Sequence, residues 1–217
     1  MSRDVQAALS YILFDLLDDT ATLMPDPVIV AHSLGGGLAQ YALANSEHDE
    51  PFVSGLVLLG SIPPSGMHEA LVAWLRLDPQ CIPRFLRDMG DLRSPLSTRP
   101  LVQRAFFGEH TPQRVVQEFF DCYMNHEEAV SWVREMVFPY VEPREVMAKV
   151  PEGRVFCVGG DQDALITPDM ANYTANEYGG LEYVRPSGLS SFVFLVLDSL
   201  CFTRTLYSER RLMERGS

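Results

Sequence analysis

The stretch VIVAHSLGGGLAQYALA, residues 28–44, decides the fold of this chain. It begins with a short β-branched run, which favours a strand, and continues from Gly35 to Asn45 with the apolar spacing of a helix. Ser33 lies between the two, where a strand that turns sharply into a helix leaves one residue in a strained conformation. The positions two residues away on either side, Ala31 among them, are small, as such a turn requires. The pattern is G-x-S-x-G with alanine in place of the first glycine.

A serine in this setting is expected to be a nucleophile. The turn exposes the serine oxygen at the carboxyl end of a sheet, where the sites of α/β proteins lie. The backbone N–H of Leu34 would then open the following helix and be placed to stabilise an oxyanion. Spacing and context together favour a nucleophile at Ser33. The alternative is that Ser33 is only a small residue in a glycine-rich turn.

Three further apolar runs predict the rest of the sheet. They are VSGLVLLG (53–60), RVFCVGG (154–160) and LEYV (181–184), with a helix expected over 168–178. Continuous apolar runs, unlike alternating ones, suit strands buried on both faces of a parallel sheet. We therefore expect an α/β fold with a parallel sheet of about four strands in chain order.

The segment between the second and third runs changes to helices without strands. MHEALVAWLRL (67–77), PQRVVQEFFDCYMN (112–125) and EEAVSWVREMVF (127–138) have apolar spacings of three and four, separated by turns such as GDLRSPLSTRP (90–100). Such an insertion would cover and shape a pocket, so we interpret it as a helical cap. The residues before the first strand also have helical spacing, without the basic start and cleavage site of a signal peptide.

These patterns divide the chain into four segments. We predict a first part of the α/β core carrying the serine turn, an inserted helical cap, a second part of the core, and a divergent C-terminal tail. Their ranges are 1–60, 61–151, 152–185 and 186–217.

Composition limits the classes of function. The chain has 217 residues, 47% of them hydrophobic, which suits one α/β domain. A formal charge of −12 disfavours binding to nucleic acid, because that needs a basic surface. The apolar run FVFLVLDSLCF (192–202) is about half the roughly 20 residues of a membrane span and carries Asp198, so a buried helix or strand is expected.

Cofactor motifs are missing from the sequence. Gly35-Gly36-Gly37 has neither the Lys-Ser/Thr end of a phosphate-binding loop nor the spaced form of a dinucleotide fingerprint. The four cysteines form no zinc-type pair, so we predict no metal and no cofactor, with reduced thiols in a cytoplasmic protein. They stand at Cys81, Cys122, Cys157 and Cys201.

The residues around Ser33 resemble the nucleophile elbow of the α/β-hydrolase superfamily. VFCVGGDQDALITPDM (155–170) similarly resembles that family's later strand with its acid, in a G-x-x-D…P arrangement. The resemblance implies that Asp163 is the acid of a Ser-His-Asp triad, with Asp161 the weaker candidate. The alternative is that both aspartates only end a strand and begin a helix, where anions are favoured anyway.

The resemblance implies a serine hydrolase acting on an ester or related carboxyl substrate through an acyl-enzyme on Ser33. The apolar composition of the cap favours a small hydrophobic substrate. The similarity runs over roughly residues 4–185 and matches only the C-terminal half of the family's domain. The four earlier strands, and the loop that carries a second oxyanion-hole N–H, have no counterpart. The run VIVAH, central in the family's sheet, is therefore expected to be an exposed edge through which the chain associates with itself or a partner.

The triad base is the second departure from the family. In the family, a histidine follows the last strand close to a glycine, which here would be Gly188, and Ser190 or Ser191 stands in its place. All five histidines precede Asp163. His32 is expected to be structural, because successive strand residues point to opposite faces, and the cap histidines, His110 and His126, are expected to be surface residues.

Two hypotheses remain at this point. The first is a serine hydrolase whose activity is weak or lost. The second is a non-catalytic truncated or alternatively spliced derivative, or a gene-model fragment, of such an enzyme.

Overall fold

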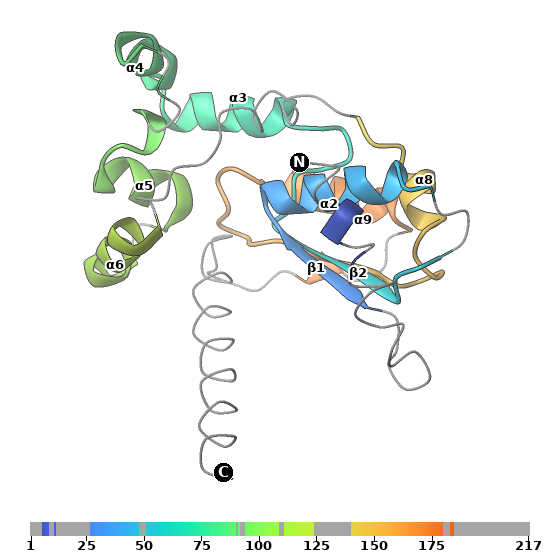
Figure 1. Cartoon of the computed structure of the whole chain (residues 1–217). Coiled ribbons are helices and arrows are strands. Elements are labelled where there is room, and N and C mark those ends of the chain that lie inside the picture. Colours follow the sequence, from blue (N-terminus) through green and yellow to red (C-terminus); the bar gives the residue numbers. More distant parts are fainter. Residues whose placement is uncertain are drawn as a thin grey trace, which may run out of the picture.

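The computed structural model describes residues 6–8, 11, 27–47, 51–89, 91, 94–108, 111–123, 140–179 and 183–184. Figure 1 shows how the strands and helices are arranged. In chain order the elements are β1 (Val28–His32), α2 (Leu34–Ala44), β2 (Gly55–Leu59), α3 (His68–Leu77), α4 (Cys81–Arg87), the 3₁₀ turn η3 (Ser94–Leu96), α5 (Arg99–Phe106), α6 (Gln113–Tyr123), α8 (Pro143–Met147), β3 (Val155–Val158), α9 (Pro168–Glu177) and β4 (Tyr183–Val184).

The strands form one parallel sheet in the order β1-β2-β3-β4, which confirms the predicted α/β class and strand order. Val30 pairs with Val57 in the register of β1 and β2, and Val57 pairs with Phe156 in the register of β2 and β3. β4 then pairs with β3. β1 therefore forms one edge of the described sheet, as the sequence led us to expect.

A single hydrophobic cluster covers one face of this sheet. Alternate strand residues, among them Leu56 and Leu58, pack against buried side chains of helices, among them Leu43 of α2 and Val146 of α8. Figure 1 shows α2, α8 and α9 on the same side of the strands. The residues 141–150 thus contribute to the sheet's core, although the sequence division placed them with the helical insertion.

Helices α3 to α6 and the turn η3 form the described part of the insertion between β2 and β3, and they lie beside the sheet rather than on its covered face (Figure 1). A separate aromatic and aliphatic cluster holds α5 and α6 together around Val102 and Phe119. The ring of Phe119 meets those of Phe106 and Phe107 edge to face, at centroid distances of 6.2 and 5.6 Å. Residues 127–138, predicted to be helical, lie outside the described residues.

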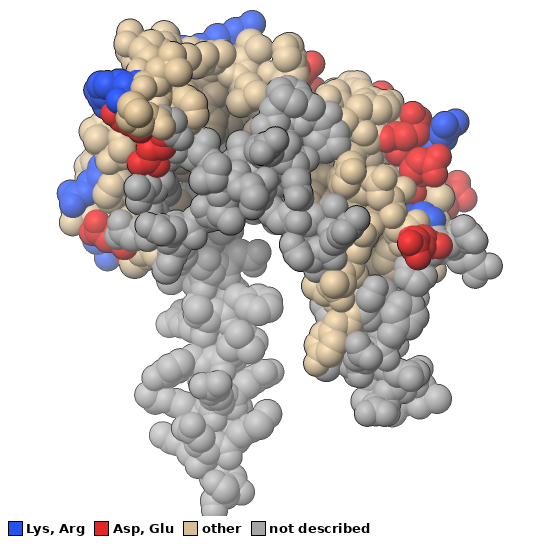
Figure 2. All heavy atoms as spheres, turned by 45° about the horizontal axis from the view of Figure 1, so that its top comes forward, with Lys and Arg blue, Asp and Glu red and all other residues tan. Residues whose placement is uncertain are grey.

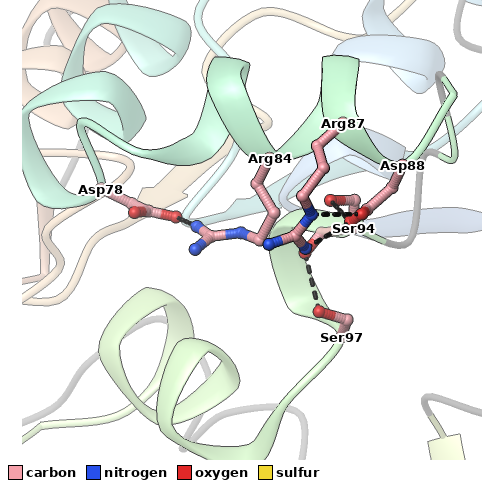
Figure 3. A network of polar contacts seen from close by, with 6 residues as sticks. All are labelled: Asp78, Arg84, Arg87, Asp88, Ser94 and Ser97. Atoms are coloured by element: carbon pink, nitrogen blue, oxygen red, sulfur yellow. Dashed lines mark hydrogen bonds and ion pairs between the residues drawn. The ribbon is translucent and has the colours of Figure 1, made fainter.

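A network of polar and charged side chains links α3, α4 and η3 (Figure 3). Arg84 forms an ion pair with Asp78. Asp88 accepts hydrogen bonds from Arg87 Nε at 2.7 Å and from Ser94 Oγ at 2.6 Å. The hydrogen bond from Arg87, followed by the one from Ser94, lowers the pKa of the Asp88 carboxyl. Ser97 Oγ in turn donates to the Ser94 carbonyl at 2.9 Å, so the turn after α4 is tied by side chains.

The N-terminal segment touches the core at one described point. Residues 6–8 are helical, and Gln6 Nε2 donates to the carbonyls of Asn45 at 2.9 Å and Ala42 at 3.4 Å, at the C-terminal end of α2. Apart from Tyr11, the remainder of the predicted first helix lies outside the described residues, as does the tail from 185 onward, which includes Cys201. Cys81, Cys122 and Cys157 are free thiols.

Two surface properties complete the description. None of the helices in the described ranges combines the length and apolar character needed to cross a membrane. On the face shown in Figure 2, Lys and Arg side chains are interspersed with Asp and Glu rather than gathered in one patch. This face therefore presents a mixed field to an approaching molecule.

Candidate active site

Ser33 has the strained backbone that the sequence predicts. Its φ of 51° and ψ of −121° lie in a region that residues with a side chain rarely adopt. Three backbone hydrogen bonds of 3.0 Å hold it there: its N–H donates to the Leu59 carbonyl, and its own carbonyl accepts from the N–H groups of Gly36 and Ile62. Hydrogen bonds to β2 and to the segment that follows β2 therefore help to hold Ser33 in its strained conformation.

The hydroxyl of Ser33 does not cap the helix that follows, although serine often has that role. Ser33 is the N-cap of α2, yet its side chain makes no capping hydrogen bond. The N–H of Leu34 opens the helix, where the first four N–H groups have no acceptor in their own helix. No acidic side chain occupies the first turn of α2. A half-buried hydroxyl thus lies next to backbone donors at the positive end of a helix.

The glycines after Ser33 differ in what they do, and the structure corrects part of our sequence reasoning. A Cβ added at Gly35 would meet nothing within 4 Å, so crowding does not explain the small residue there. A Cβ at Gly36 would instead lie 2.1 Å from Ser61 Oγ and 2.5 Å from Ser61 Cβ. Gly36 is the residue that lets α2 approach the end of β2.

A buried polar network fixes this approach. Gln40 Nε2 lies within hydrogen-bond distance of the Gly36 carbonyl at 3.0 Å, Ser61 Oγ at 3.0 Å and the Ile62 carbonyl at 2.9 Å. Gln40 Oε1 accepts from the hydroxyl of Tyr178 at 2.7 Å. Burial raises the pKa of that hydroxyl, so it remains a donor. The network joins α2, the segment after β2 and the end of α9 beneath the serine turn.

The network was missed by the sequence reasoning, although Gln40 carried a signal. It is an uncharged polar residue on a helix whose other buried positions are Gly36, Ala39, Ala42 and Leu43. A polar side chain on such a face needs buried partners. Its partners could not be found in the same way, because Tyr178 is 138 residues away in the chain.

Asp163 lies in the loop between β3 and α9 and is only 4% exposed. Its Oδ1 accepts hydrogen bonds from the backbone N–H groups of Leu165 and Ile166, each at 3.0 Å. These bonds stabilise the ionised carboxylate and orient the other oxygen, Oδ2. Asp161 is more exposed than Asp163. Thr167, further along, caps α9 through a hydrogen bond from the Met170 N–H.

Ser33 and Asp163 both follow strands at the carboxyl edge of the same sheet. Backbone bonds connect the strand ends there, from Ser33 N to Leu59 O and from Gly60 N to Val158 O. A hydrophobic cluster also joins the immediate neighbours of the two residues, because Leu34 packs against the buried group that contains Ile166. The buried members of that group are Ile62, Ala70, Ala73, Ile166 and Met170.

The helical insertion reaches this edge at two points. Ala70 and Ala73 of α3 belong to the cluster that contacts Leu34. Further along, a Cβ at Gly108 would lie 3.5 Å from Gln162 Oε1, in the loop that carries Asp163. The insertion therefore borders both the serine turn and the acidic loop.

Histidines near the site are few in the described ranges. His32 precedes Ser33 at the end of β1 and is half-buried, and His68 is exposed at the start of α3. His48, His110 and His126 lie outside the described residues. Within the described ranges, no group of three or more His, Cys, Asp or Glu side chains could hold a metal ion.

Comparisons with known proteins agree with this geometry. A family model described as "Alpha/beta hydrolase family" matches residues 3–195. A search of curated proteins gives no match.

Solved structures match over most of the chain. The esterase from Exiguobacterium antarcticum is 18% identical with a TM-score of 0.52, and the alignment covers 94% of this chain and 73% of that one. An esterase from Rhodococcus sp. ECU1013 is 17% identical with a TM-score of 0.58, covering 89% and 68%. Homoserine O-acetyltransferase from Staphylococcus aureus is 16% identical with a TM-score of 0.52, covering 88% and 61%. At this level of identity the likeness shows the fold alone.

Proposed function

Because the chain belongs to the alpha/beta hydrolase family, we propose that it carries the site of a serine hydrolase acting on an ester or related carboxyl compound. The backbone of Ser33 carries this proposal. A φ of 51° between a strand and a helix is the feature that a nucleophile elbow requires, and three backbone bonds maintain it. Two of the structural neighbours are named as esterases, which favours an ester among carboxyl substrates.

Each proposed residue has a role in acyl transfer. Ser33 Oγ attacks the carbonyl carbon, the bond to the leaving alcohol breaks, and water later hydrolyses the resulting acyl-enzyme. The N–H of Leu34 donates to the oxyanion that forms on the carbonyl oxygen. Asp163, with Oδ1 fixed by two N–H groups, orients a base and stabilises its charged form through Oδ2.

The triad base, for which the sequence offers no histidine at the family's position, limits the activity that we propose. No histidine follows Asp163 in these 217 residues, and Ser190 and Ser191 stand where the family's histidine would be. A serine hydroxyl without a base is a poor nucleophile at neutral pH. We therefore infer that turnover by this chain of 217 residues is weak. The alternative, a non-catalytic derivative of the family, is favoured by the same observation.

The helical insertion is proposed to act as a cap that favours a small hydrophobic substrate. Its contacts beside Leu34 and beside Gln162 support this role, because they border both parts of the site. Half-buried apolar side chains, such as Leu34 and Met67, face that region. Apolar linings with few polar groups are typical of small-molecule sites.

A fluorophosphonate probe, which reacts with activated serines, tests the proposal. The unaltered chain should react slowly with the probe, and the Ser33→Ala variant should react no faster than the uncatalysed background. Ser190→His, which restores a base after the last strand, should raise the rate at Ser33 by about 10²-fold or more. Adding Asp163→Asn to Ser190→His should remove most of this gain.

The outcomes separate the two hypotheses. Labelling of the Ser190→His variant at a residue other than Ser33, or at a rate that Ser33→Ala leaves unchanged, would contradict the nucleophile assignment. No gain from Ser190→His in a folded protein would favour the non-catalytic derivative. Rapid labelling of the unaltered chain at Ser33 would show that another residue serves as base.

We also propose that the edge that β1 forms in the described sheet associates with a second copy of the chain in the cytoplasm. Strand edges present unpaired N–H and C=O groups that another strand can use. Sedimentation velocity at micromolar concentration should show a species larger than the monomer. A single monomeric species would overturn this part of the proposal. The free thiols Cys81, Cys122 and Cys157 support a reducing compartment.

A further inference from the structure

A buried series of hydrogen bonds leads from the end of α9 to the peptide that joins Ser33 and Leu34. The hydroxyl of Tyr178 donates to Gln40 Oε1 at 2.7 Å, and Gln40 Nε2 donates to the Ile62 carbonyl at 2.9 Å. The backbone N–H of Ile62 donates in turn to the Ser33 carbonyl at 3.0 Å. Both Gln40 and Tyr178 are buried. Two side chains that lie away from the sheet edge are thus connected to the serine turn.

The amide of Gln40 can face its neighbours in one orientation. The carbonyls of Gly36 and Ile62 can only accept hydrogen bonds, so the amide nitrogen must face them, at 3.0 and 2.9 Å. The amide oxygen then faces the Tyr178 hydroxyl, which is its donor. Burial raises the pKa of this hydroxyl, so it keeps the proton that it donates. Tyr178 therefore selects the orientation in which Gln40 Nε2 holds Ile62.

The segment that Gln40 holds is stiff. Ile62 is followed by Pro63 and Pro64, which are both buried and whose rings fix their φ angles. A residue that precedes a proline is itself restricted to extended backbone. Ser61 Oγ also donates to the Ile62 carbonyl, at 2.9 Å. In such a segment, the bond to the carbonyl of Ile62 also determines where its N–H lies.

The bond from Ile62 determines the direction of the Leu34 N–H. The Ser33 carbonyl and the Leu34 N–H belong to one planar trans peptide, in which the two groups point in opposite directions. The carbonyl accepts from the N–H groups of Gly36 and Ile62. The bond from Gly36 lies within the first turn of α2 and moves with that helix, whereas the bond from Ile62 ties the peptide to the end of β2. Holding the carbonyl in this way fixes the opposite N–H.

We propose that Gln40 and Tyr178 are positioning residues that set the orientation of the Ser33–Leu34 peptide. They act through Ile62 and not on the reacting atoms. An oxyanion donor is effective only when its direction is fixed before the charge develops. The benefit for catalysis rests on the proposed function, in which the Leu34 N–H is this donor. The orientation itself does not depend on that function.

Two NMR measurements on the full, isotope-labelled chain test the proposal. Gln40→Met keeps the length of the side chain but removes both polar ends. The amide of Ile62 should then exchange with solvent about 10-fold faster relative to the amides of β2. The residual dipolar coupling of the Leu34 N–H should depart from its value in the unaltered chain, while the amides of β1, β2 and β3 keep theirs. Tyr178→Phe should change the same two signals less, and it provides the readout if Gln40→Met does not fold.

Thr174→Val is the matched control. It removes another buried hydroxyl of α9, one that donates to the Met170 carbonyl of the same helix at 2.9 Å. Both signals should stay unchanged in this variant. Combining Gln40→Met with Tyr178→Phe should have no larger effect than Gln40→Met alone, because Tyr178 acts through Gln40.

Three results would overturn the proposal. The first is an unchanged coupling of Leu34 in Gln40→Met, since Gln40 would then stabilise the segment without orienting the peptide. The second is a changed coupling without faster exchange of Ile62, because the effect would not pass through that residue. The third is an equal effect of Thr174→Val, which would show that any loss of a buried hydrogen bond in α9 has this consequence.

Fluorophosphonate labelling separates this proposal from the proposed function. Adding Gln40→Met to Ser190→His should slow labelling at Ser33 by at least about 10-fold, which is part of the loss caused by removing an oxyanion donor. If Ser190→His gives no labelling at Ser33, the proposed function fails, and the two NMR signals still decide whether Gln40 orients the peptide. Labelling at Ser33 that Gln40→Met leaves unchanged would show that the orientation has no catalytic value.

Discussion

The sheet with its covering helices and the helical insertion are built on different principles. In the sheet region, one continuous cluster joins β1, β2 and β3 to α2, α8 and α9, and a buried network around Gln40 fixes the spacing beneath Ser33. In the insertion, α5 and α6 share a small cluster of their own. Polar side chains link α3, α4 and η3, among them the ion pair between Arg84 and the buried Asp78.

Because of this difference, the serine turn is held in one position, whereas the helices of the insertion are expected to vary more easily. The strained backbone of Ser33 persists because two strands and a buried network define its position. The insertion borders the same site, but α5 and α6 pack in a cluster of their own. We therefore expect that these helices can be repacked with less effect on the serine turn. In a site of this design, the reacting groups lie at the end of the sheet, and the residues that contact the substrate can vary in the insertion.

The largest effect is expected from Phe119→Ala. Phe119 is buried between Phe106 and Phe107, and truncating such a phenylalanine costs about 3–5 kcal/mol. If the two regions are independent, hydrogen exchange in 99–123 should accelerate strongly while the amides of β1, β2 and β3 keep their protection. Loss of protection in both regions to the same extent would show that they unfold as one unit.

The next effect concerns Gly36. Gly36→Ala should lower the free energy of unfolding by about 3 kcal/mol, because the new Cβ collides with Ser61. Gly35→Ala is the matched control. It meets open space and should be neutral or stabilising by up to about 1 kcal/mol. Urea denaturation of the two variants measures both changes. Equal effects would mean that Ser61 moves aside and that the close approach is not required.

A smaller effect is expected at alkaline pH in the sheet region. Burial raises the pKa of the Cys157 thiol from 9.0 to about 11. The unfolded chain therefore loses this proton first, and stability falls as pH rises from about 9 to about 11. At pH 10 the loss is about 1.4 kcal/mol. Urea midpoints of the chain and of Cys157→Ala, measured from pH 8 to 10, should diverge in slope. Parallel slopes would show that this thiol is not shielded.

The smallest effect is expected in the insertion, for Asp88→Asn. The bonds from Arg87 and Ser94 lower the pKa of Asp88, so the carboxylate stabilises the fold above its unfolded pKa and loses this effect as pH falls. Exposed charge pairs contribute little to stability. Exchange of the amides in 81–97 should be slightly faster in the variant at neutral pH, and the difference should vanish as pH falls through the lowered pKa of Asp88. A difference that persists in acid would point to a role other than charge.

Local patterns predicted the sheet and the serine turn well. The runs around Val30, Val57 and Cys157 became strands in the expected order, because burial on a parallel sheet requires continuous apolar residues. Ser33 was identified because a strand-to-helix turn has small neighbours at fixed spacing. Each single strand, and likewise the serine turn, is encoded within about a dozen consecutive residues.

Features that depend on distant residues could not be predicted in this way. The requirement for Gly36 arises from Ser61, and the partner of Gln40 is Tyr178 near the end of the described core. The exposure of Val28 and Val30 at one edge of the sheet likewise results from how the strands are ordered in space, which no single run reveals. The assignment of Asp163 as the triad acid stays a prediction, because its burial and its loop suit a structural carboxylate equally well.

The register of the sheet also sets an order of events during folding. Val30 and Val57, paired in β1 and β2, are 27 positions apart, whereas Val57 and Phe156, paired in β2 and β3, are 99 positions apart. Contacts between residues close in the chain form sooner, because less chain entropy is lost before they stabilise one another. The unit from β1 to β2 can thus assemble as the chain is synthesised. The loop that carries Asp163 can reach the carboxyl edge of the sheet only after the insertion between β2 and β3 has been made and β3 has docked.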